Sequence, residues 1–530
     1  MSSKQLALVS VLVLLPALYV QWDFAASPPP GHHVSGFFQG DMPTYVCYAR
    51  MGEPSTLGLT YQNAHDIRDD GGTPLVNLPI SLMGWLLHAG MGPIVLEHVM
   101  RIVFGFTMFF VLGLLLRVVF PDRRWFWMAF VVTSIGGGFT WWTALHDMPD
   151  GTLNPISWIL MRTRMLQQTH YWWFLDVYRN LWYPLELAYH TMLFGQLYAL
   201  ATRRWRMACS CHALGCLSNP FLGIQMSAIQ LPVLLAAFLW TRARPAKRYL
   251  AVSFVAALLF VSYYALLLPL DDVARSLEDQ HRFAYRHNLE LWVMRIEYGP
   301  ALLGLLGLVV DRGFRRMIRD QWTLVPPLAL ALVTLVLSQH GRLGIGTLMP
   351  MHFTRGYLHT GLWILTLAWG VRLAMLWKLE KVAVVAAALA VAMTLPGTYF
   401  FLRWEQLHGP QAQGVIWPHD YQEVLDLLED EPEPKRIVVH DWELGRQICA
   451  LTWHRSAFGT ELTTPHYSAR VQDLHEYART GDPPALIEWA DVVIVRPSQG
   501  DLRRRLEVDA GWEPWFENRT WKVFRRTTSP

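Results

Sequence analysis

The sequence predicts a polytopic α-helical membrane protein with about eleven transmembrane helices, followed by a small α/β domain. Charged residues occupy 16% of the 530 positions and hydrophobic residues 52%, whereas an ordinary soluble domain carries about 25% charged residues. Several apolar runs reach about 17–22 residues, enough for a helix to cross the roughly 30 Å hydrocarbon core of a bilayer. The formal net charge of +3 gives no sign of a nucleic-acid partner.

The predicted spans are apolar runs bounded by polar or basic residues. A cleaved signal peptide is the alternative for the first run, and we expect that run to be retained because many spans follow it. The fifth run is short for a crossing and needs cover from its neighbours. The spans cover residues 6–20, 93–119, 125–145, 184–201, 207–217, 222–240, 249–270, 298–310, 322–337, a tenth span that ends near Arg372, and 382–399.

The basic residues of the connecting segments predict the orientation of these spans. Eighteen Lys and Arg residues fall in the short connections on the side of the N-terminus, and eleven fall in the much longer loops of the other side. Because Lys and Arg are enriched in cytoplasmic loops, the N-terminus is expected in the cytoplasm. We therefore expect a multi-pass protein of the cytoplasmic, or inner, membrane whose C-terminal domain is extracytoplasmic.

Two domains are expected, a transmembrane module over residues 1–400 and an α/β domain over 401–530. The module includes an outer loop, about residues 22–92, with interfacial helices, because its apolar stretch 75–91 is interrupted by Pro79 and Gly84. In the second domain, residues 437–439 and 492–495 are short apolar runs typical of buried strands. Helices are predicted at 421–428, 444–451 and 471–478, and a closing hairpin at 515–517 and 521–524.

Ionisable residues gather in three groups on the predicted outer loops or at the outer ends of spans, where the long loops of this chain lie. Such residues at membrane depth are costly and by default indicate function. Glu186 and His190 are four residues apart, so they share one helix face. The groups are Asp41; Asp147, Arg164, Glu186 and His190; and His352 with Arg355.

Structural roles are the alternatives for the same residues. Asp41 precedes Met42-Pro43 and is suited to cap a helix. Glu186 and His190 suit an internal polar pair, and Arg355 suits a snorkelling anchor at the outer boundary.

The five cysteines fit no zinc spacing and suit small packing positions. A disulfide between Cys47 and Cys449 is the alternative if both residues face an oxidising compartment.

The layout of the chain resembles the GT-C superfamily of integral-membrane glycosyltransferases. The shared features are a cytoplasmic N-terminus, one span, a long outer loop with an early Asp and interfacial helices, and then many spans. Residues 512–518 (WEPWFEN) and 522–525 (KVFR) resemble the closing strands of bacterial members' periplasmic domains. The turns 217–221 (LSNPF) and 352–355 (HFTR) are also similar to those of relatives. Members include protein mannosyltransferases, aminoarabinose transferases and mycobacterial arabinosyltransferases.

This resemblance implies an enzyme that moves a sugar from a polyprenyl-phosphate donor to a glycan, lipid or protein acceptor at the membrane. Family enzymes use an acidic residue of the first outer loop as the general base, which implies Asp41 here. A departing lipid phosphate needs neutralisation, for which Arg355, His352 and Arg164 are the candidates.

Three further residues, Asp147, Glu186 and His190, are candidates to orient the acceptor or to hold a divalent cation, Mg²⁺ or Mn²⁺. Many members carry an Asp-x-Asp pair, but position 43 is proline, which leaves metal dependence open. No cofactor is assigned with certainty.

Two other functions remain as alternatives. A transporter or flippase of a lipid-linked or polar substrate would use discontinuous helices, and the break at residues 218–220 (SNP) is the feature that favours it. A non-catalytic assembly factor on the same fold is favoured by the missing second acidic residue near Asp41.

Overall fold

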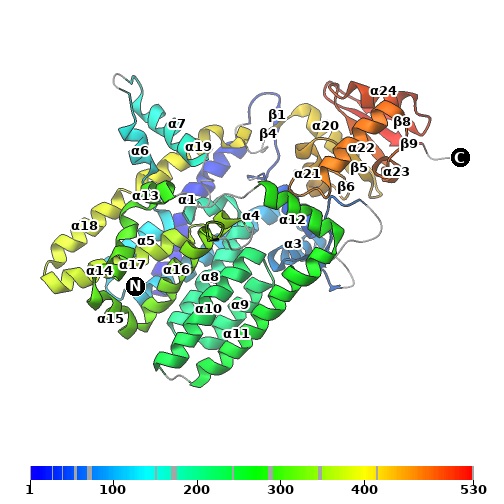
Figure 1. Ribbon diagram of the computed structural model, residues 1–530. Coiled ribbons are helices and arrows are strands. Elements are labelled where there is room, and N and C mark those ends of the chain that lie inside the picture. Colours follow the sequence, from blue (N-terminus) through cyan, green and yellow to red (C-terminus); the bar gives the residue numbers. More distant parts are fainter. Residues whose placement is uncertain are drawn as a thin grey trace. The chain divides into compact units, whose positions relative to one another are not determined.

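The computed structural model describes residues 2–26, 28–38, 40–52, 56–67, 75–149, 152–168, 176–241, 244–284, 291–343, 349–412 and 416–527. Helices dominate these residues, and a five-stranded sheet is their largest β element (Figure 1). The chain divides into two compact units, which we call the helical unit and the sheet unit. The helical unit comprises Met1–Asp23, His98–Ser262 and Tyr285–Gly409, and the sheet unit comprises Phe24–Glu97, Tyr263–Ala284 and Pro410–Pro530.

The helical unit is built from helices that follow one another with short connections. The 3₁₀ segments η3 (Tyr178–Trp182) and η8 (Pro350–Phe353) lie between them. The α-helices that lie wholly or mostly in this unit are α1 (Ser3–Ala26), α4 (Pro93–Val119), α5 (Arg123–Ile135), α6 (Thr140–His146), α7 (Pro155–Gln168), α8 (Pro184–Ala201), α9 (Trp205–Cys216), α10 (Pro220–Thr241), α11 (Arg244–Ser262), α13 (Leu291–Tyr298), α14 (Leu303–Val310), α15 (Arg312–Asp320), α16 (Val325–Ser338), α17 (Tyr357–Trp377), α18 (Glu380–Ala392) and α19 (Leu395–Ala412).

Six helical stretches among the described residues are long and apolar enough to cross a membrane, which supports the predicted class of a helical membrane protein. Two further pairs, α5 with α6 and α15 with α16, pass the same test together but are bent by 73° and 103°, so the number rises to eight if each pair is one span. The predicted count of eleven is not confirmed. The six stretches are Ser3–Asp23, Pro93–Val119, Pro220–Trp240, Ala246–Leu270, Tyr357–Trp377 and Glu380–Leu407.

Three predicted spans fall short of these criteria for identifiable reasons. Helix α9 has 12 residues and α14 has 8, which correspond to only about 18 Å and 12 Å of helix. Helix α8 has 18 residues, but it carries the buried polar side chains Glu186, His190 and Gln196. These three segments therefore stay predictions as membrane spans.

The bend between α5 and α6 requires three consecutive glycines, Gly136–Gly137–Gly138. Gly138 has a φ of +78°, and a Cβ at this position would lie 2.3 Å from the Glu297 carboxylate. A Cβ on Gly137 would lie 2.1 Å from the Thr398 backbone nitrogen. Only residues without a side chain permit this close approach, which brings the broken helix against α13 and α19.

The sheet unit combines a five-stranded sheet with helices and two short strand pairs. The sheet order is β6-β5-β7-β9-β8; β5 runs parallel to β6 and β7, and β9 pairs antiparallel with β7 and β8. Strand β1 (His32–Val34) pairs with β4 (Ile416–Pro418), and β2 (Thr60–Tyr61) pairs with β3 (Leu75–Val76). The sheet strands are β5 (Arg436–Val439), β6 (Arg455–Ser456), β7 (Val492–Val495), β8 (Trp512–Glu517) and β9 (Lys522–Arg526).

The helices of the sheet unit come from three separate parts of the chain. Helices α2 (Met42–Arg50) and α3 (Leu78–His88) belong to the predicted outer loop, and α12 (Asp272–Ala284) to a later one. The C-terminal helices are α20 (His419–Glu429), α21 (Trp442–Leu451), α22 (Tyr467–Thr480), α23 (Ala485–Trp489) and α24 (Gly500–Val508). The strands, helices and hairpin predicted after residue 400 are therefore confirmed as elements, while their side of the membrane and the division at residue 400 stay predictions.

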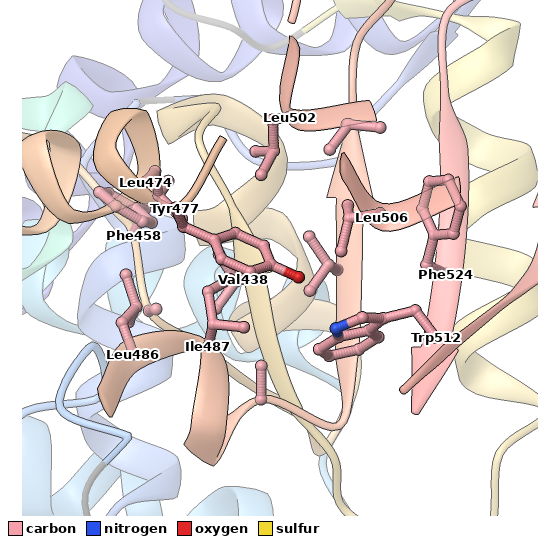
Figure 2. Close-up of a cluster of buried hydrophobic side chains, with 14 of the residues drawn as sticks. Val438, Phe458, Leu474, Tyr477, Leu486, Ile487, Leu502, Leu506, Trp512 and Phe524 are labelled. Carbon is pink, nitrogen blue, oxygen red and sulfur yellow. The ribbon is translucent and has the colours of Figure 1, made fainter. Parts of the chain in front are cut away.

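Two hydrophobic clusters lie on opposite faces of the sheet because successive strand residues point in opposite directions. Ile437 and Val439 pack with residues of α20 and α21. Val438 packs with residues of α22, α23 and α24 (Figure 2). Ile67, from the segment that follows β2, is fully buried in this second cluster, so the early loop supplies part of the core of the sheet unit.

The burial of Ile67 predicts that the early loop contributes to the stability of the sheet unit. Ile67→Ala is expected to lower the free energy of unfolding by about 2–5 kcal/mol, because it removes buried methyl groups and leaves a cavity. Val508→Ala on α24, where the side chain is 75% exposed, is the matched control and should change the free energy by less than about 0.5 kcal/mol. Chemical denaturation of the purified protein in detergent measures both, and equal effects would contradict the assignment of Ile67 to the core.

Candidate functional site

An ion pair between Arg355 and Glu186 is the centre of the site in the helical unit. Arg355 Nη1 lies 2.7 Å from Glu186 Oε2, and the two side chains are 3% and 8% exposed. Arg355 follows η8, and Glu186 lies in the first turn of α8. Two groups of residues that are far apart in the sequence therefore meet through opposite charges that water scarcely reaches.

Two histidines complete the polar contacts of this pair. Arg355 Nη2 lies 2.6 Å from His352 Nδ1 and donates to it, so that nitrogen carries a lone pair. His190 Nε2 lies 2.7 Å from the Arg355 carbonyl oxygen, and its Nδ1 lies 2.6 Å from that of Glu186. The Phe221 ring stacks on His352 with ring centroids 4.5 Å apart. The site thus has an apolar wall on one side of the imidazole.

The backbone at Arg355 and Gly356 is what directs the guanidinium inward. Arg355 has a φ of +33° and Gly356 a φ of +75°, a conformation that glycine adopts readily. A Cβ on Gly356 would lie 2.4 Å from the Val177 nitrogen, so the position requires glycine. The chain then enters α17 at Tyr357, and the turn is held between α17 and the residues that precede η3.

The buried contacts of Arg355, Glu186 and His190 show which of the structural roles considered for them applies. Arg355 does not act as a snorkelling anchor, because its guanidinium is buried against a carboxylate. Both ring nitrogens of His190 face carbonyl oxygens, and Glu186 is paired with Arg355. Among the described residues, no group of three or more His, Cys, Asp or Glu side chains could hold a metal ion. The described residues around this pair therefore do not form a site for a divalent cation.

The other two residues of the predicted group are not brought to this ion pair by any described contact. Asp147, at the end of α6, pairs with Arg162 of α7 at 3.1 Å, and both side chains are partly exposed. Arg164 belongs to α7, but its side chain lies outside the part of the chain that the structure describes.

Asp41 lies in the sheet unit, immediately before α2. It occupies the N-cap position, but its side chain makes no capping hydrogen bond, and the residue is exposed. The carboxylate is therefore not used to begin the helix, which starts with a proline in its first turn.

Arg446 of α21 holds the backbone beside Asp41, and sequence reasoning did not single it out. Its Nη1 donates a hydrogen bond to the Gly40 carbonyl oxygen, and its guanidinium lies 4.2 Å from the centroid of the Trp442 ring. Burial lowers the pKa of Arg446, whereas the Asp41 carboxylate raises it, so the two charges are close enough to interact. No sequence signal links positions 41 and 446; only the packing of α2 on α21 does.

A second buried charge network in the helical unit was also missed. Arg179 of η3 pairs with Asp176 at 2.6 Å and with Glu297 of α13 at 3.2 Å. It also donates to the Gly137 carbonyl oxygen at 3.0 Å. All three ionisable side chains are at most 2% exposed. The network ties the glycine break to η3 and α13.

Comparison with known proteins finds likeness in structure. ArnT from Cupriavidus metallidurans in the apo state is 12% identical, covers 97% of both chains and has a TM-score of 0.50. ArnT bound to undecaprenyl phosphate is 13% identical, with 97% of both chains covered and a TM-score of 0.47. The oligosaccharyltransferase AglB from Archaeoglobus fulgidus, with an inhibitory peptide and a dolichol-phosphate, is 13% identical, with coverage of 99% of this chain and 74% of that chain and a TM-score of 0.46.

No protein-family model and no curated protein matches the sequence. The likeness to apo ArnT extends over nearly the whole length of both chains. ArnT is a GT-C glycosyltransferase. The chain therefore has the GT-C fold, and the resemblance inferred from its layout is confirmed at the level of fold.

The burial of the Arg355–Glu186 pair predicts a large stability loss when one partner is removed. Glu186→Gln is expected to lower the free energy of unfolding by about 3–5 kcal/mol, because Arg355 is left buried without a carboxylate. Asp147→Asn, which breaks the exposed pair with Arg162, is the control and should cost less than about 1 kcal/mol. Chemical denaturation in detergent compares the two; similar costs would show that Arg355 does not depend on Glu186.

Proposed function

We propose that the protein is a GT-C membrane glycosyltransferase that moves one sugar from a polyprenyl-phosphate donor to an acceptor. The observation that carries the proposal is the GT-C fold shared with ArnT over 97% of both chains. Complexes of ArnT with undecaprenyl phosphate and of AglB with a dolichol-phosphate have been solved, and a lipid phosphate is the group we assign to this chain's donor.

The Arg355 turn is the proposed site of the donor phosphate. A buried guanidinium forms strong, paired hydrogen bonds to phosphate oxygens, and Arg355 Nε has no hydrogen-bond partner among the described residues. His352 stands next to it and supplies a second nitrogen. Glu186 would keep the site neutral until the phosphate arrives and would orient the guanidinium afterwards. Arg164 remains a further candidate on α7.

Asp41 is the proposed general base. Its exposed carboxylate would take the proton of the acceptor hydroxyl, while the freed oxygen attacks the anomeric carbon and the bond to the lipid phosphate breaks. The electrons of that bond go to the phosphate, and attack from the opposite face inverts the configuration. Arg446 would position the base by holding the Gly40 carbonyl.

The proposed setting is the outer face of the cytoplasmic membrane, with the N-terminus inside and the sheet unit outside. The acceptor would be a glycan, a lipid or a protein, and the sheet unit would recognise it. Membrane lipid is the other partner, and no nucleic acid is involved.

The base assignment predicts that Asp41→Asn removes sugar transfer without unfolding the protein. We expect kcat to fall by about 10²–10⁴-fold, the usual contribution of a general base, with an unchanged melting temperature because the side chain is exposed. Asp501→Asn on α24, also an exposed carboxylate, is the control and should retain full activity. The readout is transfer of radiolabelled sugar from a polyprenyl-phosphate donor. Full activity of Asp41→Asn would exclude Asp41 as the base, and an inactive wild-type protein would favour the assembly-factor alternative.

The phosphate assignment predicts a donor-specific defect for Arg355→Lys. Lysine keeps the charge opposite Glu186 but cannot form the paired contacts of a guanidinium. We expect the KM for the lipid donor to rise by about tenfold to hundredfold, the equivalent of one lost charge-assisted hydrogen bond, with little change in the KM for the acceptor. Arg162→Lys is the matched control on a partly exposed pair. An unchanged donor KM in Arg355→Lys would contradict the assignment.

A further inference from the structure

Two of the five cysteines, from opposite ends of the chain, meet inside the sheet unit. Cys47 lies on α2 and Cys449 on α21, and both are buried. The two side chains lie close enough for each to change the pKa of the other, and Cys47 Sγ contacts the Arg446 carbonyl oxygen, three residues before Cys449. The other three cysteines, Cys209, Cys211 and Cys216, are all on α9 of the helical unit. The meeting of Cys47 and Cys449 therefore depends on how α2 packs against α21.

Contacts on either side of the two thiols hold α2 and α21 in register. Cys47 Sγ donates to the Arg446 carbonyl oxygen at 3.3 Å. Towards the start of α2, Arg446 donates to the Gly40 carbonyl, and towards its end Arg50 donates to the Thr452 carbonyl. The sulfur pair thus lies between two arginine anchors that prevent the helices from sliding apart.

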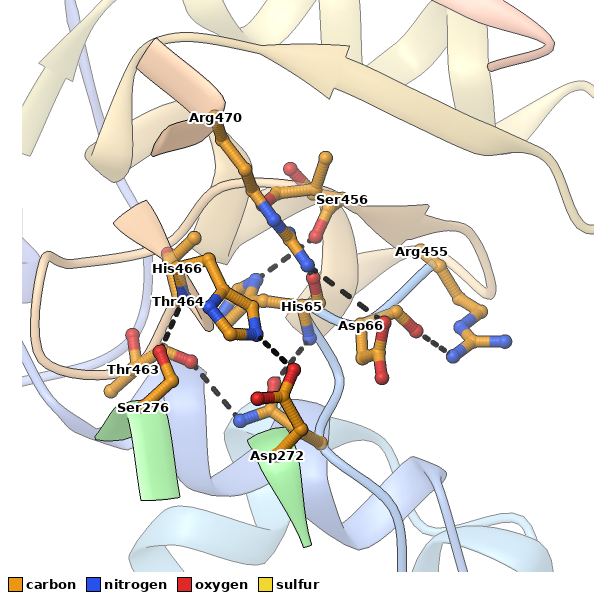
Figure 3. A network of polar contacts seen from close by, with 12 residues as sticks. His65, Asp66, Asp272, Ser276, Arg455, Ser456, Thr463, Thr464, His466 and Arg470 are labelled. Atoms are coloured by element: carbon orange, nitrogen blue, oxygen red, sulfur yellow. Dashed lines mark hydrogen bonds and ion pairs between the residues drawn. The ribbon is translucent and has the colours of Figure 1, made fainter. Parts of the chain in front are cut away.

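His65 supplies a base next to the pair. Its Nδ1 lies 3.0 Å from the Ser456 carbonyl oxygen, so Nδ1 carries the ring proton and Nε2 keeps a lone pair. Arg470 fixes the His65 backbone by donating to its carbonyl oxygen at 2.6 Å (Figure 3). The Cys449 sulfur accepts a hydrogen bond from the Ser456 nitrogen at 3.1 Å and also lies beside His65.

The two thiols differ in acidity. Burial raises the pKa of Cys47 well above its usual value. Burial acts in the same direction on Cys449, but the neighbouring Cys47 and His65 lower its pKa well below the usual value. The folded sheet unit therefore surrounds the two sulfurs unequally.

We propose that Cys47 and Cys449 form a disulfide bond that fastens α2, with Asp41 at its start, to α21. The thiolate of one of the two cysteines attacks a disulfide of an extracytoplasmic thiol–disulfide oxidoreductase, and one thiolate of the oxidoreductase leaves. The other cysteine then attacks the mixed disulfide at the first cysteine's sulfur, and the second thiolate leaves. The oxidant gains two electrons and the two thiol protons, so its disulfide becomes a dithiol. The bond forms before the pair is buried and is then shielded from reductants.

This inference rests on the proposed outward placement of the sheet unit, where disulfides persist. Membranes that contain the full chain are denatured directly in light N-ethylmaleimide, then reduced and treated with a heavy maleimide, and the peptides are identified by mass spectrometry. We expect the heavy label on Cys47 and Cys449 and the light label on Cys209, Cys211 and Cys216. Light label on Cys47 and Cys449 would overturn the disulfide.

Single serine variants identify the partner of each cysteine. In Cys47→Ser, Cys449 should move from the heavy to the light label, whereas Cys209→Ser should leave Cys47 and Cys449 heavy. If Cys449 stays heavy in Cys47→Ser, it pairs elsewhere and the proposal fails. Sugar transfer is measured separately, and a failed transfer assay leaves this result intact because the label reports only the oxidation state of sulfur.

Discussion

A buried arginine must be paired, and this requirement organises the helical unit. Removing a guanidinium from water costs several kcal/mol unless a carboxylate or carbonyls replace the lost hydration. Glu186 meets this need for Arg355, while Asp176 and Glu297 meet it for Arg179. Each pairing joins segments that are distant in sequence. The charges therefore determine which helices pack together, whereas apolar surfaces alone would permit many arrangements.

The sheet unit meets the same requirement mostly with backbone carbonyls. Arg446 binds the carbonyl of Gly40, Arg50 that of Thr452, and Arg470 those of His65 and Ala457. Loop backbone needs donors when it is buried, and these guanidiniums provide them. The early loop can therefore enter the core, as Ile67 does, without leaving polar groups unsatisfied.

The sequence could predict those strands and helices that local residue patterns encode. Apolar runs predicted β5, β7 and the six stretches that are long and apolar enough to cross a membrane, and a spacing of four placed Glu186 and His190 on one helix face. The meeting of Glu186 with Arg355 depends on the turn at Gly356 and on tertiary packing, which no local pattern encodes. The same holds for Arg446 beside Asp41. The predicted spans that correspond to α8, α9 and α14 are not confirmed, because α9 and α14 are short and α8 carries buried polar side chains.

The packing of α2 against α21 has a consequence for biosynthesis. Helix α2 leaves the ribosome long before the residues that hold it, from Arg446 to Thr452, are made. The segment that carries Asp41 therefore lacks its partner helix α21 while the intervening helices are translated and inserted. Its final conformation is set only after α21 has been made, so the order of synthesis delays the assembly of this part of the protein until the intervening helices have been translated.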